Sequence, residues 1–244
     1  MLATRSERFG PLETDRYDVY EPPGAALGVT VALVHGGLWL AVYDWGYVRP
    51  LAAALARAGC HVALVEYART GMPGGGWPGT GDSVRRAVTA VAADAGLPDP
   101  LIAVGHSSGG QLVVWTGSEN RCPELTGVVS LSGVVDLQAA AQDEIVSSAI
   151  HGLLGGGPDT APDAWHDADP RLQRLTTPAV ILHGRDDPDL PARISVEYHR
   201  TRTAEDAACR LEVIDDCEHF GLVDPRHPGF ASVISAVREL AGLG

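Results

Sequence analysis

The sequence predicts an α/β fold in which a mostly parallel central sheet is covered by helices on both faces. Two observations support this prediction. Short apolar runs alternate along the chain with segments whose apolar residues recur at helical spacing. Several of the short runs are apolar at nearly every position, which is typical of parallel strands buried on both faces.

The expected strands are short β-rich runs bounded by Gly, Pro or polar residues. The first covers residues 17–20 and stops at Pro22 and Pro23. The others are expected at residues 29–34, 62–65, 101–104, 128–131, 179–182 and 211–214.

The expected helices lie between these strands. The first covers residues 48–58, with Leu51 and Leu55 on one stripe and Gly59 as its stop. The next follows a Gly-rich loop at residues 71–81 and carries Val84, Val88 and Val91. Further helices are expected from about residue 109, over 192–201 and over 230–240.

The stretch from about residue 137 to 177 interrupts this alternation with helical pieces and the break Gly155-Gly156-Gly157-Pro158. We expect it to form a small lid over a site at the strand ends. The whole chain, 1–244, is predicted to be a single domain, as its length allows.

Composition narrows the possible chemistry and partners. The chain has no lysine: all 18 basic residues are arginines, set against 31 acidic residues for a net charge of −13. Schiff-base catalysis and the phosphate-binding lysines of nucleotide enzymes are therefore excluded. The acidic excess disfavours nucleic acid as a partner, so a small-molecule substrate is expected. Monomer and homodimer both remain open.

The cysteines and the N-terminus give weaker indications. Cys60, Cys122, Cys209 and Cys217 have no metal-binding spacing and are interpreted as structural thiols. The first residues show no apolar signal segment, and no apolar run reaches the roughly 18 residues that span a membrane. The sequence therefore predicts a cytoplasmic protein without membrane contact.

A serine motif provides the strongest functional signal. Gly105-His106-Ser107-Ser108-Gly109 fits the pattern G-x-S-x-G, directly after an expected strand and before an expected helix. This is the strand–turn–helix context of a nucleophile elbow, where a sharp turn exposes the serine hydroxyl. Ser107 is therefore the candidate nucleophile.

A nucleophilic serine needs an orienting acid, expected after the strand at 179–182. That strand leads into His183-Gly184-Arg185-Asp186-Asp187-Pro188-Asp189-Leu190-Pro191, which resembles the HGxxDxxVP segment of α/β-hydrolases. The alignment selects Asp187. A slip of one residue would select Asp186, and Asp136 after the preceding strand is a third candidate.

The general base is expected in the loop after the last strand. His219 lies five residues beyond Ile214 and completes the order Ser, Asp, His. His35 and His183 end apolar strands, where a hydrogen-bonded structural histidine is the usual finding.

A glycine pair after the first long buried strand suggests an oxyanion hole. In His35-Gly36-Gly37-Leu38-Trp39, the glycines would let backbone N–H groups turn towards a substrate oxygen. A simple turn that ends the strand is the alternative.

With these segments in view, the chain from about residue 29 onward resembles the α/β-hydrolase superfamily. The resemblance implies an α/β-hydrolase fold and a triad of Ser107, Asp187 and His219. It also implies oxyanion donors at the N–H groups of Gly37 or Leu38 and of Ser108. It implies no metal and no organic cofactor. The segment His35 to Trp39 resembles the HGGxW segment of kynurenine formamidases and related small esterases, with Leu38 in place of the usual Tyr.

The expected function is hydrolysis of small carboxylic esters or aryl amides through an acyl-enzyme. The alternatives are an acyltransferase or thioesterase that uses the same triad, and a non-catalytic ligand-binding homologue. The candidate pocket residues are aromatic side chains near the motifs or in the possible lid, namely Trp39, Tyr43, Trp45, Trp77 and Trp165.

Overall fold

A computed structural model of the protein describes residues 1–243. Its eight strands form one sheet in the order β1-β2-β4-β3-β5-β6-β7-β8. The strands from β4 to β8 in this order pair in parallel, and β1 and β2 add an antiparallel pair at one edge. The predicted α/β fold with a mostly parallel sheet is therefore confirmed. The strands are β1 Arg5–Arg8, β2 Arg16–Tyr20, β3 Thr30–Val34, β4 His61–Val65, β5 Leu101–His106, β6 Leu125–Leu131, β7 Ala179–Gly184 and β8 Cys209–Ile214.

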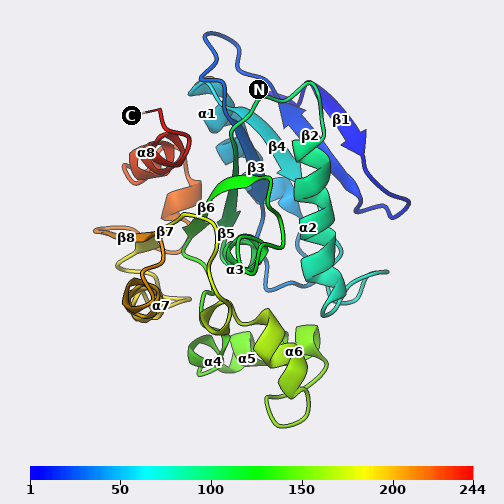
Figure 1. Ribbon diagram of the computed structural model, residues 1–244, viewed down its shortest axis with the longest axis vertical. Helices are drawn as coiled ribbons and strands as arrows, with labels where there is room; N and C mark the ends of the chain where they lie inside the picture. The colour runs from blue at the N-terminus through cyan, green and yellow to red at the C-terminus, as the bar shows by residue number, and fades with distance from the viewer. Residues whose placement is uncertain (244) are drawn as a thin grey trace.

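Helices cover both faces of this sheet (Figure 1). One face packs against α1 and α8, and the other packs against α2, α3 and α7. The helices are α1 Arg49–Arg57, α2 Gly79–Ala92, α3 Ser108–Thr116, α4 Leu137–Ala140, α5 Glu144–Leu154, α6 Pro162–Ala168, α7 Arg193–Ala204 and α8 Phe230–Leu240. Three short 3-10 turns are η1 Trp45–Val48, η2 Pro170–Leu172 and η3 Gly221–Val223.

Two apolar layers hold the helices on the sheet. Along β3, Val31 and Leu33 face one layer while Ala32 and Val34 face the other, as side-chain alternation requires. All four are fully buried. Burial on both faces explains why the sequence of β3 is a continuous apolar run.

The structure differs from the expected elements at two places. β1 was not expected, because Arg5, Glu7 and its two other residues are all polar, and they alternate between partly buried and exposed positions. The Gly-rich loop is shorter than predicted, because α2 begins at Gly79. A Cβ at Gly81 would meet the rings of Trp77 and Trp115 at about 3 Å, so this glycine lets the helix start pack closely.

The segment between β6 and β7 contributes α4, α5 and α6, which gather at one end of the molecule away from α1 and α8 (Figure 1). Its role as a lid and the single-domain organisation stay predictions. Within residues 1–243, no helix has the length and apolar character needed to cross a bilayer. The four cysteines are free thiols.

Asp169, at the end of α6, should make stability depend on pH. Burial, with the nearby charge of Asp136, raises the pKa of Asp169 from its ordinary value of 3.8 to about 6. Because the folded state holds this proton more tightly than the unfolded chain, the ionised carboxyl destabilises the fold above about pH 6, and stability is regained as the pH falls towards 4. Asp169→Asn should therefore gain stability over the wild type by about 2 kcal/mol more near pH 8 than near pH 4, since each pKa unit corresponds to ~1.4 kcal/mol and the unfolded carboxyl is already partly ionised at pH 4. Urea unfolding of both proteins near pH 4 and near pH 8 tests this. The same stability difference between variant and wild type at the two pH values would contradict it.

Candidate active site

Four segments meet at the carboxyl ends of the parallel strands. In the sheet, β3 lies between β4 and β5. The polypeptide therefore passes from β3 to β4 on one side of β3, and β5 is then added on the other side. Such a switch point opens a crevice at the strand ends. The segment from His35 to Trp39 follows β3, Ser107 follows β5, Asp187 follows β7 and His219 follows β8.

Ser107 sits on a sharp turn between β5 and α3. Its backbone has φ 54° and ψ −121°, a conformation that costs energy in a residue with a side chain. The flanking glycines allow the turn to close: a Cβ at Gly105 would lie 2.2 Å from the carbonyl oxygen of Gly109, and a Cβ at Gly109 would lie 2.4 Å from that of Val34. The strand–turn–helix context expected from the motif is therefore present.

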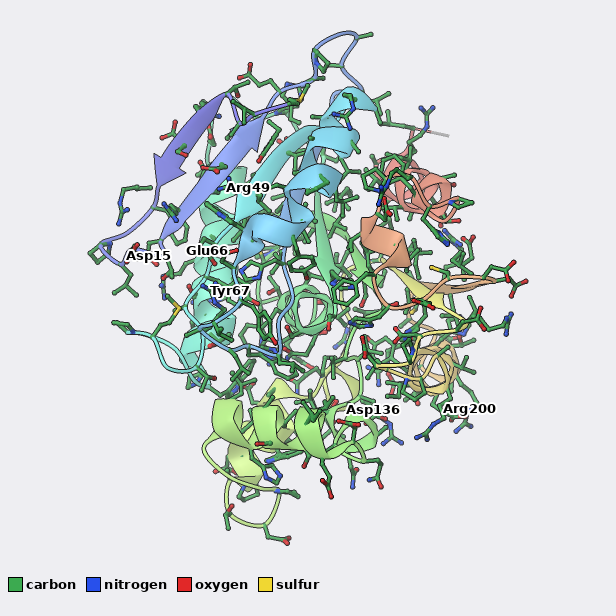
Figure 2. All side chains as sticks on the ribbon, turned by 180° about the vertical axis from the view of Figure 1, so that it is seen from behind. Asp15, Arg49, Glu66, Tyr67, Asp136 and Arg200 are labelled. Carbon is green, nitrogen blue, oxygen red and sulfur yellow. The ribbon has the colours of Figure 1, made fainter. Side chains whose placement is uncertain are left out.

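Asp187 and His219 are in direct contact. His219 Nδ1 lies 2.7 Å from Asp187 Oδ2, and both side chains are almost fully buried. The two other candidate acids lie elsewhere. Asp186 is exposed. Asp136 caps α4 by accepting from Ala139 N–H and pairs with Arg171, at the position labelled in Figure 2.

The surroundings of Asp187 favour its charged form. Burial alone would raise its pKa, but hydrogen bonds from His183, His219 and the backbone N–H of Leu190 hold the pKa of this carboxyl well below its usual range. His183 is fully buried, with Nε2 2.8 Å from the carbonyl oxygen of Leu190 and 3.4 Å from Asp187 Oδ2. A carboxylate held in this way can orient His219 and stabilise its protonated form.

The candidate oxyanion segment follows β3 and has an unusual backbone. Gly37 has φ 116° and Leu38 has φ 53°. The N–H of Gly36 donates to the Tyr47 hydroxyl at 2.7 Å and is not free. The N–H groups of Gly37, Leu38 and Ser108 meet no acceptor within residues 1–243, so they remain available for a substrate oxygen.

A cavity of about 540 Å³ joins these segments. Its lining includes the candidate catalytic pair Ser107 and His219, the candidate oxyanion residues Gly37 and Leu38, and the aromatic residue Tyr43. Further residues were not anticipated from the sequence: Tyr47, His106, Val134, Asp143, Ile145, Val146, Pro188, Asp189, Leu190 and Phe220. Ser108, fully buried as the first residue of α3, contributes no side chain to this lining.

Four of the five aromatic candidates do not line this cavity. Trp39 is fully buried and donates to Gln111. Trp45 packs under Arg16 and Arg49. Trp77 donates to Asp167 and meets Trp115 edge to face, and Trp165 donates to the carbonyl of Gly156. These indoles donate their N–H groups or bury their rings outside the cavity. Their position near a motif in the sequence was therefore not enough to place them in its wall.

A buried ion pair contacts the start of the candidate oxyanion segment. Glu66 and Arg69 are both almost fully buried and form a salt bridge. Glu66 Oε1 also lies 2.9 Å from His35 Nε2, and the Tyr67 hydroxyl donates to the His35 carbonyl oxygen at 3.0 Å. Burial would raise the pKa of Glu66, but His35 and Arg69 lower it overall. Figure 2 labels Glu66 and Tyr67.

Removing this ion pair should destabilise the protein. Glu66→Ala leaves the Arg69 guanidinium buried without its partner, which is expected to cost about 3–5 kcal/mol of unfolding free energy. Glu197→Ala is the matched control, because Glu197 forms an equally spaced pair with Arg200 at the surface, where a pair contributes about 0–1 kcal/mol. Urea unfolding measures both, and equal losses would contradict this expectation.

One group of side chains offers metal-ligating atoms. Among the described residues, Asp187, Asp189 and His219 bring three such atoms within 4.8 Å of one another.

Comparisons with known proteins agree with the fold. The bovine (Bos taurus) protein phosphatase methylesterase 1 is 27% identical over 185 residues, which are 70% of this chain and 45% of that protein. The chain therefore spans less than half the length of this curated relative. An esterase B from Lactobacillus rhamnosis matches with a TM-score of 0.80 at 15% identity, over 100% of this chain and 89% of that chain. A truncated carbohydrate esterase from gut microbiota matches with a TM-score of 0.78 at 19% identity, over 98% and 97%.

A family model gives the assignment. The BD-FAE model matches residues 17–201, from β2 into α7, which is more than half of the chain. The matched region contains the candidate oxyanion segment, the Ser107 turn and Asp187. The chain belongs to the BD-FAE family, an esterase family within the α/β-hydrolase superfamily.

Proposed function

We propose that this protein is a serine hydrolase that cleaves small carboxylic esters or aryl amides, with Ser107 as nucleophile, His219 as general base and Asp187 as orienting acid. The observation that carries the proposal is the 2.7 Å contact between His219 and Asp187 beside the cavity to which Ser107 also contributes. No hydrogen bond joins Ser107 to His219 among the described residues, and such catalytic bonds often tighten only when substrate binds.

The reaction follows from these positions. His219 takes the Ser107 proton as the hydroxyl oxygen attacks the substrate carbonyl, and the negative oxygen that forms accepts from the N–H groups of Leu38 or Gly37 and of Ser108. His219 then gives the proton to the leaving alcohol or amine. Water, deprotonated by His219, releases the acid from Ser107.

The cavity favours small substrates without negative charge. A volume of about 540 Å³ suits a small ligand, and aromatic and aliphatic side chains form much of the wall. The charged lining residues other than histidine are Asp143 and Asp189, with no arginine. We infer that neutral or cationic esters are better substrates than esters whose acyl or alcohol part carries a carboxylate.

A parallel assay tests the proposal and its two branches. Purified protein is treated with a fluorophosphonate probe and assayed on p-nitrophenyl acetate, p-nitrophenyl butyrate and N-formylkynurenine. Probe labelling with faster cleavage of the p-nitrophenyl esters supports the esterase branch, and faster cleavage of N-formylkynurenine supports the arylformamidase branch. Absence of both labelling and hydrolysis would contradict the proposal.

A further inference from the structure

Two side chains outside the proposed triad connect its parts. Tyr47 lies on η1, and His106 is the last residue of β5, directly before Ser107. The Tyr47 hydroxyl lies 2.7 Å from the Gly36 nitrogen and 2.8 Å from His106 Nδ1. On the other side of the imidazole, His106 Nε2 lies 2.9 Å from the carbonyl oxygen of His219.

The Gly36 N–H can only donate, so the Tyr47 oxygen accepts from it. In a neutral His106 protonated on Nε2, Nδ1 can only accept, so the Tyr47 O–H donates to it. A carbonyl oxygen can only accept, so His106 carries its proton on Nε2 and donates to His219. This arrangement requires a neutral His106. Burial is the largest of the effects that lower the pKa of His106 to about 3, so the imidazole remains neutral in the usual assay range.

The hydrogen-bond chain joins three separate loops. Gly36 precedes the candidate oxyanion donors, His106 precedes Ser107, and the carbonyl belongs to the residue whose imidazole is the candidate base. His106 is the hydrogen-bond partner of that carbonyl among the described residues. Phe220 packs beside this hydrogen-bond chain. Its ring centroid lies 5.9 Å from that of Tyr47 and 5.4 Å from that of His106.

We propose that Tyr47 and His106 are positioning residues, whose hydrogen-bond chain holds the oxyanion segment and the His219 loop in register with Ser107. The proposal rests on the proposed hydrolase function. Neither residue exchanges a proton with substrate. A shift of about 1 Å in one of the three loops is enough to lower turnover roughly 100-fold.

The test compares variants that remove hydrogen bonds of this chain with one variant that can form them again. Tyr47→Phe removes the central hydroxyl, and His106→Leu removes both imidazole nitrogens. His106→Gln places an amide that can accept from Tyr47 and donate to His219. Tyr198→Phe is the control, because Tyr198 is another buried tyrosine, on α7, whose hydroxyl has no partner within residues 1–243.

We expect kcat for p-nitrophenyl acetate to fall about 10- to 100-fold in Tyr47→Phe and His106→Leu with KM nearly unchanged. We expect His106→Gln to recover much of this loss and Tyr198→Phe to match the wild type. Melting temperatures are measured for every variant. Wild-type kcat in Tyr47→Phe and His106→Leu would overturn the positioning role. A loss of kcat that follows the melting temperature and that glutamine does not rescue would also overturn it.

A second measurement separates this inference from the proposed function. The ¹⁵N chemical shifts of histidine should show His106 as the neutral Nε2–H tautomer at neutral pH, with this preference weakened in Tyr47→Phe. A protonated or Nδ1–H imidazole would overturn the inference whether or not the protein hydrolyses esters. A wild-type protein with the expected tautomer but no hydrolysis and no probe labelling would refute the proposed function alone.

Discussion

Replacing Ser107 with alanine is expected to lower kcat/KM for a p-nitrophenyl ester by at least about 10⁴-fold and to abolish fluorophosphonate labelling. Loss of the nucleophile removes the acyl-enzyme route, and what remains is the smaller acceleration from substrate binding and oxyanion donors. The turn itself should persist, because its strain comes from the backbone and its close approaches are made by Gly105 and Gly109. Steady-state kinetics and gel detection of the labelled protein measure the two effects.

Ser130→Ala is the matched control for this experiment. Ser130 lies on β6, is fully buried, and its hydroxyl has no hydrogen-bond partner in the described part of the chain. Its loss should leave both kinetics and labelling unchanged. If Ser107→Ala kept wild-type turnover, another residue would have to be the nucleophile.

Asp187→Asn is expected to reduce kcat by up to about 10⁴-fold while the folded structure is retained. An amide at this position cannot stabilise the protonated imidazole, and its N–H₂ group can force His219 into the wrong tautomer. Stopped assays at high enzyme concentration, together with the melting temperature, separate a loss of turnover from a loss of structure.

Asp186→Asn provides the contrast, because it makes the same chemical change one position away on an exposed side chain. Near-wild-type kinetics are expected for this variant. If Asp186→Asn lost activity and Asp187→Asn kept it, the assignment of the acid would be reversed.

Much of the architecture follows from local patterns in the sequence. The helix at residues 230–240 was predicted with its observed bounds, because its apolar spacing is regular. The residues of the proposed triad were also chosen from sequence patterns, because each residue follows a recognisable strand. β1 escaped prediction because it is short and polar and lacks apolar alternation, and it joins the sheet by pairing with β2, the next strand in the chain.

The walls of the cavity were less predictable. Whether a tryptophan lines a cavity or lies in the core depends on which helices cover it, and Trp39 and Trp165 are held by partners on other elements or turns. Tyr47 and His106 meet only because β3 and β5 are neighbours in the sheet. His106 was visible within the serine motif, but its partners were not.

The side chains on the two edge strands of the sheet affect how readily the protein aggregates at high concentration. An unpaired edge strand can template the addition of another strand, and charged side chains along it oppose such aggregation. β1 carries Arg5, Glu7 and Arg8 at one edge, and β8 carries Arg210 and Glu212 at the other. Both edges therefore carry charged side chains of the kind that opposes the addition of another strand.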